Sequence, residues 1–340
     1  MFKRSKLELY VVTLAVVLAL IVVMLGAYTR LTNAGLGCPD WPGCYGHLVL
    51  PSAKKALDTA QLQYPQIPIE SSKAWTEMIH RYAAGLLALL VFSLGFYNLR
   101  LWYQSHLPLK ILPLVLMLLI LFQAALGMWT VTLKLLPIVV MAHLLGGILI
   151  FSLLLRLRVQ LSHVAKYAEQ SPLWQFWISL GIGLVFCQIA LGGWVSANYA
   201  GIACIGFPRC NGQWLVPLHL AQGFYLFSPV GANYQGGLLD NEVRVTIQFI
   251  HRVGAIVVAT YMLSLCSLIL WKIKAKPVRT VAALIILLII MQITLGALNV
   301  IYLLPLSVAV AHNGIAALLL AACLSLLYFT TQKGVNNVSS

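Results

Sequence analysis

Apolar residues along this chain fall into eight long runs, and polar or charged segments separate each run from the next. A helix of about 20 apolar residues is long enough to cross a hydrocarbon layer of roughly 30 Å. The even number of runs places both termini on one side of the membrane. We therefore predict membrane-spanning helices at residues 9–28, 75–98, 111–130, 138–157, 174–196, 244–271, 279–300 and 306–328.

The composition agrees with this pattern and excludes a soluble globular protein. Hydrophobic residues make up 61% of the 340 residues and charged residues only 9%, whereas a soluble domain needs far more polar surface. In the predicted topology, 13 of the 22 Lys and Arg residues lie on the side of the termini, and the positive-inside rule assigns this side to the cytoplasm. The net charge of +14 therefore reflects topology, and no nucleic-acid partner is needed to explain it.

The two halves of the sequence repeat one another. IHR recurs at 79–81 and 250–252, and QAALG at 123–127 matches QITLG at 292–296. Such a duplication predicts an all-α integral membrane fold of two tandem four-helix bundles in parallel orientation, related by a pseudo-twofold axis. We expect one domain at 1–160 and the other at 161–340. Parallel repeats also occur in transporters, so the repeat alone does not choose a function.

Each even-numbered span carries a histidine near its outer end. His80, His143, His251 and His312 lie five to seven residues past the predicted starts, roughly 8 to 10 Å below the membrane boundary at 1.5 Å per residue. Two imidazoles from facing helices can ligate a haem iron from both sides. A single intramembrane histidine is as readily a hydrogen-bonded core residue. Four of them, duplicated and matched in depth, favour two bis-histidine haem sites.

The odd-numbered spans end in the dipeptide Leu-Gly, at Gly26, Gly127, Gly192 and Gly296. The spacing from Gly127 to His143 equals the spacing from Gly296 to His312, which is 16 residues. Small residues let helices approach closely within a membrane. For each glycine taken alone, plain helix packing is the favoured interpretation.

Charged and polar residues beside the histidines suggest that the two predicted sites differ. Arg81 and Arg252 follow two of the histidines, where a guanidinium can pair with haem propionates or extend to the lipid interface. Glu77 lies one turn before His80, and Gln248 takes its place in the second half. A carboxylate suits a site where protons move or positive charge develops, although a negative charge at a helix N-terminus is favourable anyway. We predict different roles for the two pockets.

Two cysteine pairs with C-x5-C spacing lie in the long outer loops, where disulfides persist. We predict the disulfides Cys38–Cys44 and Cys204–Cys210, each closing a loop over a haem pocket. Residues 52–64 predict a short surface helix covering the first pocket. The remaining cysteines fall in apolar spans and are expected in the core: Cys187, Cys266 and Cys323.

Together these features resemble the haem A synthase family, in its bacterial form with cysteine pairs in the outer loops. The resemblance covers nearly the whole chain. Its residues are GAYTRLTNAGLGCPDWPGCYG at 26–46, EMIHR at 77–81, IHRVGA at 250–255, His143, His312 and the two cysteine loops.

This resemblance implies that the protein oxidises the C8 methyl group of haem O to the formyl group of haem A by successive hydroxylations. It implies that His80 and His143 flank haem O beside a catalytic Glu77, and that His251 and His312 ligate haem b. Haem O synthase and oxidase assembly factors are the implied partners. We expect a multi-pass protein of the bacterial plasma (inner) membrane, with both termini cytoplasmic and both haem pockets toward the outer face.

Two other classes compete with this interpretation. A quinone-linked electron-transfer protein would hold haem b in both pockets, but carriers that move charge across a membrane usually place haems near opposite faces. A transporter or haem-delivery protein fits poorly with Glu77 beside a ligand and with few polar residues at mid-membrane. The sequence leaves open the electron acceptor, the source of oxygen, any redox activity of Cys38 and Cys44, and whether the chain forms a homo-oligomer.

Overall fold

The computed structural model describes residues 6–51, 53–65, 68–105, 109–162 and 172–331. Within these ranges the chain is helix and loop, without a β-strand beyond isolated bridges. The helices are α1 (Lys6–Leu31), α2 (Lys54–Gln63), α3 (Ser71–Ser105), α4 (Ile111–Thr132), α5 (Pro137–Leu161), α6 (Pro172–Ala197), α7 (Leu220–Gly223), α8 (Asn241–Lys272), α9 (Lys276–Ile301) and α10 (Leu306–Thr331).

Eight of these helices are long and apolar enough to cross a membrane, which confirms the eight predicted spans. Helices α3 and α8 begin earlier than predicted, at Ser71 and Asn241, because a helix can continue into water beyond its apolar stretch, and both first residues are exposed. His80 and His251 therefore lie further from the starts of their helices than the predicted five and seven residues. The starts of the helices are therefore not a common reference for the depth of these histidines.

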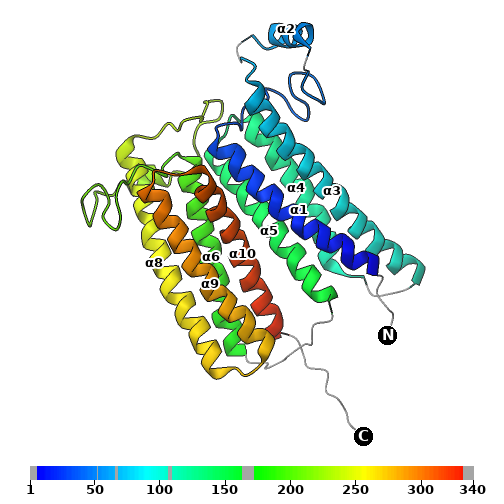
Figure 1. The fold of residues 1–340 in the computed structure, drawn as a ribbon, viewed down its shortest axis with the longest axis vertical. Coiled ribbons are helices and arrows are strands. Elements are labelled where there is room, and N and C mark those ends of the chain that lie inside the picture. The colour runs from blue at the N-terminus through cyan, green and yellow to red at the C-terminus, as the bar shows by residue number, and fades with distance from the viewer. Residues whose placement is uncertain (1–5, 52, 66–67, 106–108, 163–171, 332–340) are drawn as a thin grey trace.

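The spanning helices pack in two groups, which Figure 1 shows side by side. In one group α1 and α4 each contact both α3 and α5, and in the other α6 and α9 each contact both α8 and α10. The groups meet where α10 contacts α1 and α5, and where α5 contacts α6. Helix α10 is the most buried of the spans, and its small residues, such as Ala317, Ala321 and Ser325, allow close packing.

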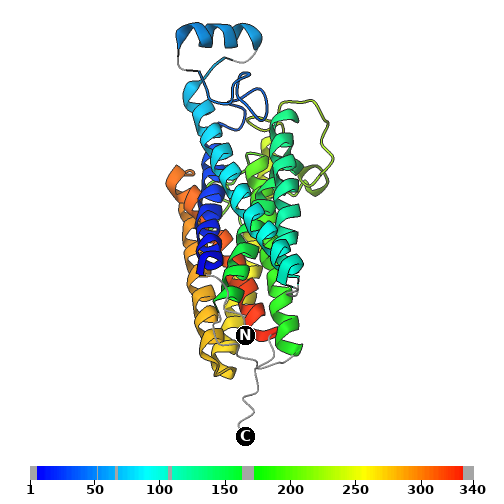
Figure 2. The same cartoon turned by 90° about the vertical axis from the view of Figure 1, so that its right-hand side faces the viewer.

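The first described residues of α1 and the last of α10 lie at the same end of the molecule (Figure 1). Helix α2 lies at the opposite end, beyond the start of α3, as both views show (Figures 1 and 2), and this end is called the outer end below. Helix α2 confirms the short helix predicted within 52–64. The long loops that carry the cysteines lie at this same end, so the two predicted pockets and their covers share one face.

Candidate functional site

Each of the four histidines packs against one of the four Leu-Gly glycines. A Cβ atom on any of these glycines would lie 3.1 to 3.3 Å from the nearest imidazole Cε1 atom, so glycine lets the ring approach the helix backbone. Each glycine lies five residues before the end of its helix, so each ring packs at the same distance from the end of the helix that carries its glycine. The pairs are Gly26 with His80, Gly127 with His143, Gly192 with His251 and Gly296 with His312.

In the first group of helices, two imidazoles face one another. The ring centroids of His80 and His143 are 6.4 Å apart, and the ring planes are nearly perpendicular, at 83°. With metal–nitrogen bonds of about 2 Å, and half a ring width on each side, two imidazoles that share one metal ion stand at about this separation. The pair therefore fits a haem iron bound from both faces. In the second group, His251 packs against Gly192 of α6 and His312 against Gly296 of α9.

Glutamines from the odd-numbered spans contact three of the histidines, which the sequence analysis did not foresee. Gln188 Nε2 lies 3.0 Å from Nδ1 of His251 and donates to its backbone oxygen at 2.9 Å. The signal was present in the sequence, because Q-x3-G recurs as QAALG, QIALG and QITLG at 123–127, 188–192 and 292–296. Four residues is one helical turn, so each glutamine and its glycine share a face.

Glu77 is buried at the outer end of the first group, where it joins α3 to the first cysteine loop. Its Oε2 accepts a hydrogen bond from Cys38 N at 2.9 Å, and its Oε1 accepts one from Arg81 Nη2 at 2.5 Å. Arg81 Nη1 in turn donates to Asp40 O at 3.0 Å and to Gly43 O at 2.5 Å. The carboxylate is thus an anion with a fixed cationic partner, one turn from His80.

In the second group an arginine also bonds to the carbonyl oxygens of a cysteine loop, but no carboxylate stands at the position equivalent to Glu77. Arg252 Nη1 donates to Gly206 O at 2.9 Å, and its Nη2 donates to Cys204 O. Gln248 Nε2 donates to Gly201 O at 3.3 Å and makes no ion pair with the arginine. Both arginines therefore hold a loop through its carbonyl oxygens. Their predicted contact with haem propionates stays a prediction.

Both predicted disulfides are present, Cys38–Cys44 with sulfur atoms 2.05 Å apart and Cys204–Cys210 with 2.09 Å. After each second cysteine the chain turns in the same way, since Cys44 N bonds to the oxygen of His47 and Cys210 N to the equivalent oxygen three residues on. The two loops are therefore built alike.

Among the free cysteines the core prediction holds for Cys266 and Cys323, which are buried. It is wrong for Cys187, which is exposed on the outside of α6. An apolar span has a face toward lipid as well as a face toward protein, and residue type alone does not separate the two.

The first cysteine loop has its own small core, which covers the outer end of α3. Tyr45 is fully buried there and its hydroxyl donates to Pro68 O at 3.2 Å. Burial raises the pKa of the Tyr45 phenol, and the carboxylates of Glu70, Asp40 and Glu77 raise it further, so the hydroxyl stays protonated. The core is formed by Cys38, Cys44, Tyr45, Leu50, Ala60, Ala74 and Met78, which brings α2 over α3.

Arg30 joins the two groups at their outer ends. It lies near the end of α1, donates to the backbone oxygen of Ser196 in α6, and places its Cζ 3.8 Å from the ring centre of Tyr199. A guanidinium stacked on a ring and bonded to a carbonyl is a stabilising cation–π arrangement. This contact joins the end of α1 to the end of α6 and the loop that follows it.

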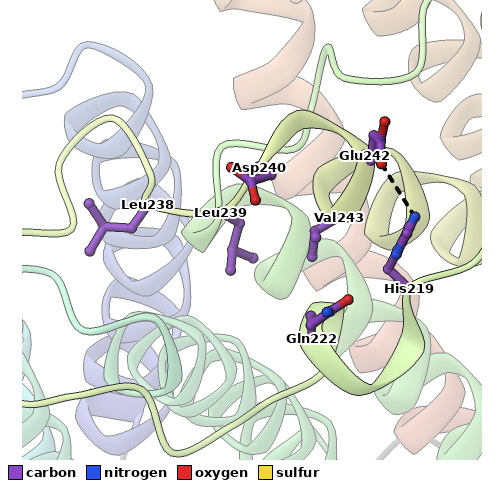
Figure 3. Close-up of a pocket in the computed structure, with 7 residues that line it drawn as sticks. All are labelled: His219, Gln222, Leu238, Leu239, Asp240, Glu242 and Val243. Atoms are coloured by element: carbon purple, nitrogen blue, oxygen red, sulfur yellow. Dashed lines mark ion pairs between the residues drawn. The ribbon is translucent and has the colours of Figure 1, made fainter.

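A separate cavity of about 340 Å³ lies between α7 and the start of α8. Figure 3 shows His219 facing Glu242 across it, with His219 Nε2 3.6 Å from Glu242 Oε2. Asp240 and Gln222 also line it, and none of the four haem-ligand candidates does. This cavity is distinct from the histidine sites.

Comparison with known proteins agrees with this geometry. The family described as cytochrome oxidase assembly protein matches residues 9–324 of the chain. A heme A synthase of Shewanella oneidensis is 44% identical over 95% of this chain and 97% of its own length. The heme A synthases of Chelativorans sp. and Rhizorhabdus wittichii are 30% and 28% identical, over 94% and 92% of this chain and 90% of their own lengths.

The match runs through all eight spanning helices and both cysteine loops, which is the region that holds every candidate residue. The chain belongs to the heme A synthase family of cytochrome oxidase assembly proteins.

Proposed function

We propose that this protein is a haem A synthase, an oxidoreductase that converts the C8 methyl group of haem O to the formyl group of haem A. The family membership supports this reaction. The observation that carries it is the difference between two similar histidine pairs, since Glu77 stands beside one pair and Gln248 beside the other. A protein that only carried electrons would not need a charged group at one of them.

We assign haem O to His80 and His143 and haem b to His251 and His312. The first half of the chain, residues 1–160, forms the substrate domain and residues 161–340 form the haem b domain. The backbone supports a duplication: all eight described non-glycine residues with positive φ fall into four equivalent pairs. The pairs are Asn33 with Tyr199, Tyr45 with Asn211, Lys134 with Leu303 and Leu135 with Leu304.

Glu77 is the proposed catalytic residue beyond the ligands. Because Arg81 and Cys38 N hold its carboxylate in place, the anion needs no reorganisation when charge develops nearby. We propose that it stabilises positive character at the reacting methyl carbon or accepts the proton released there. Haem b, when bound, supplies one-electron transfer. The cysteine loop and α2 exclude water from the outer end of this half.

The proposed setting is the bacterial inner membrane, with both termini in the cytoplasm and the pockets near the outer face. The excess of Lys and Arg on the side of the termini supports this orientation. Haem O synthase and oxidase assembly factors are the proposed partners, because one supplies the substrate and the others receive the product.

Haem extraction and mass analysis test the proposal. The purified protein should contain haem b alone when expressed without a haem O synthase. With the synthase it should contain haem b together with haem O, a hydroxylated intermediate and haem A. Haem b alone in both preparations, one in each half, would overturn the proposal and favour a two-haem electron carrier.

A further inference from the structure

The four helices that carry the Leu-Gly glycines differ at one position that faces the histidines. Four residues before the glycine, α4, α6 and α9 carry Gln123, Gln188 and Gln292. Helix α1 carries Val22 at this place, before Gly26. Three histidines therefore meet a side-chain amide, whereas Val22 offers His80 only its backbone as a hydrogen-bond partner.

The amide contacts reach different parts of the three histidines. Gln188 Nε2 lies 3.0 Å from the ring nitrogen Nδ1 of His251, and Gln292 Nε2 lies 3.2 Å from the ring nitrogen Nε2 of His312. Gln123 Nε2 donates to the backbone oxygen of His143 at 2.6 Å. An amide has both a donor and an acceptor end. Rotation of the Gln188 amide would let its oxygen accept from Nδ1–H and leave the other nitrogen free for iron.

Two of these glutamines fit into a space that glycine provides. Gly146 and Gly254 lie three residues after His143 and His251. A Cβ atom at Gly146 would lie 2.1 Å from Gln123 Oε1, and at Gly254 it would lie 2.3 Å from Gln188 Oε1. The glutamine is thus tightly enclosed at these two histidines. Three residues after His80 stands Ala83.

We propose that the three glutamines are positioning residues that hold their histidines in the ligating orientation, and that His80 is the axial ligand that exchanges most readily. This inference rests on the proposed function. A hydrogen bond from a neighbouring residue orients a ligating histidine, and its loss typically lowers metal affinity. Both ligands of haem b would be held, as suits a resident cofactor. In the substrate pocket a side-chain amide would hold only His143, and only through its backbone oxygen, as suits a haem that must enter and leave.

The test is the rate at which each haem leaves the purified protein for an excess of apomyoglobin. Haem b and haem O are distinguished by extraction, so each pocket reports separately. Gln188→Leu and Gln292→Leu should speed the loss of haem b by about tenfold to a hundredfold and leave haem O unchanged. Gln123→Leu should speed the loss of haem O and leave the loss of haem b unchanged. Val22→Gln should slow the loss of haem O relative to the apolar control Val22→Leu.

A second readout separates positioning from general packing. Gln188→Leu should shift the low-temperature EPR signal of ferric haem b toward high spin, whereas Gln188→Asn should restore part of the low-spin signal. The haem retained in the unaltered half shows that each variant has folded. Unchanged release rates and spectra in the glutamine variants would overturn the inference.

Histidine variants distinguish this failure from failure of the proposed function. If His251→Ala keeps haem b and His143→Ala keeps haem O, the ligand assignment itself is wrong. If the histidine variants lose their haems as assigned but the glutamine and Val22→Gln variants behave like wild type, only the positioning role is wrong.

Discussion

The outer ends of α3 and α8 share several contacts and differ at one position. Both present a histidine against a glycine, a loop closed by a disulfide, and an arginine bonded to the carbonyls of that loop. The halves differ one turn before the histidine, where Glu77 pairs with Arg81 and Gln248 bonds to Gly201 O instead. In the proposed function, the shared parts form a site for a haem, and the single carboxylate gives one site its reactivity.

Replacing Glu77 removes the difference between Glu77 and Gln248. It should have the largest effect of the variants considered, on the yield of haem A. Glu77→Gln makes the first half resemble the second, so the haem A yield should fall by about 100-fold to 10,000-fold, the range for loss of an acid–base or charge-stabilising group. Both haems should remain bound, because the ligands are untouched. Mass analysis of the extracted haems measures the yield. The matched control Gln248→Glu should leave it nearly unchanged, and a wild-type yield from Glu77→Gln would remove Glu77 from the mechanism.

Replacing Arg81 or Arg252 tests the same difference through the free energy of unfolding of the protein. Arg81→Met loses hydrogen bonds to carbonyl oxygens, as Arg252→Met does, and also leaves Glu77 as an unpaired buried charge. It should therefore lower the free energy of unfolding by about 3 kcal/mol more than Arg252→Met does. Arg252→Met removes only hydrogen bonds to carbonyl oxygens and should cost about 1 kcal/mol for each bond lost. Denaturant unfolding in detergent, followed by tryptophan fluorescence, measures both. The double variant Arg81→Met, Glu77→Gln should recover part of the loss. Equal losses in the two single variants would contradict the role of the ion pair.

Replacing a glycine beside a histidine by alanine should have the smallest effect. The loss of haem affinity should be equal in the two halves. Gly26→Ala and Gly192→Ala place a Cβ atom 3.1 and 3.2 Å from a histidine ring, so the ring must shift by a few tenths of an ångström. We expect haem affinity to fall about fivefold in the altered half, which corresponds to about 1 kcal/mol. Haem titration of the apoprotein measures it. Gly85→Ala and Gly183→Ala are the controls, because no atom lies within 4 Å of their added Cβ.

The fold could be predicted largely from the sequence because a membrane imposes simple rules. Spans must be apolar and about 20 residues long, and the cysteine pairs were close enough along the chain for each partner to be evident. The extents of α3 and α8 escaped prediction, because a helix does not have to stop where the lipid stops.

The surroundings of the histidines were harder to predict. Arg81 has several acceptors within reach, and only the folded cysteine loop decides that it bonds to Glu77 and to carbonyl oxygens. Gln188 lies in the middle of an apolar span, where periodicity alone cannot show whether it faces lipid or a histidine. Arg30 meets Ser196 only because the two halves pack against one another. The two arginine contacts depend on tertiary structure and leave no spacing signature, whereas the glutamines leave one in the recurring Q-x3-G.

The most direct test of the account is the haem content of two matched variants, His80→Ala and His251→Ala, each expressed with a haem O synthase. We expect His251→Ala to lose haem b while haem O stays in the first half, and His80→Ala to keep haem b while haem O and haem A are depleted. Each variant thus carries its own folding control in the other half. Loss of the same haem from both variants, or loss of haem b from His80→Ala alone, would contradict the division of roles between the two halves.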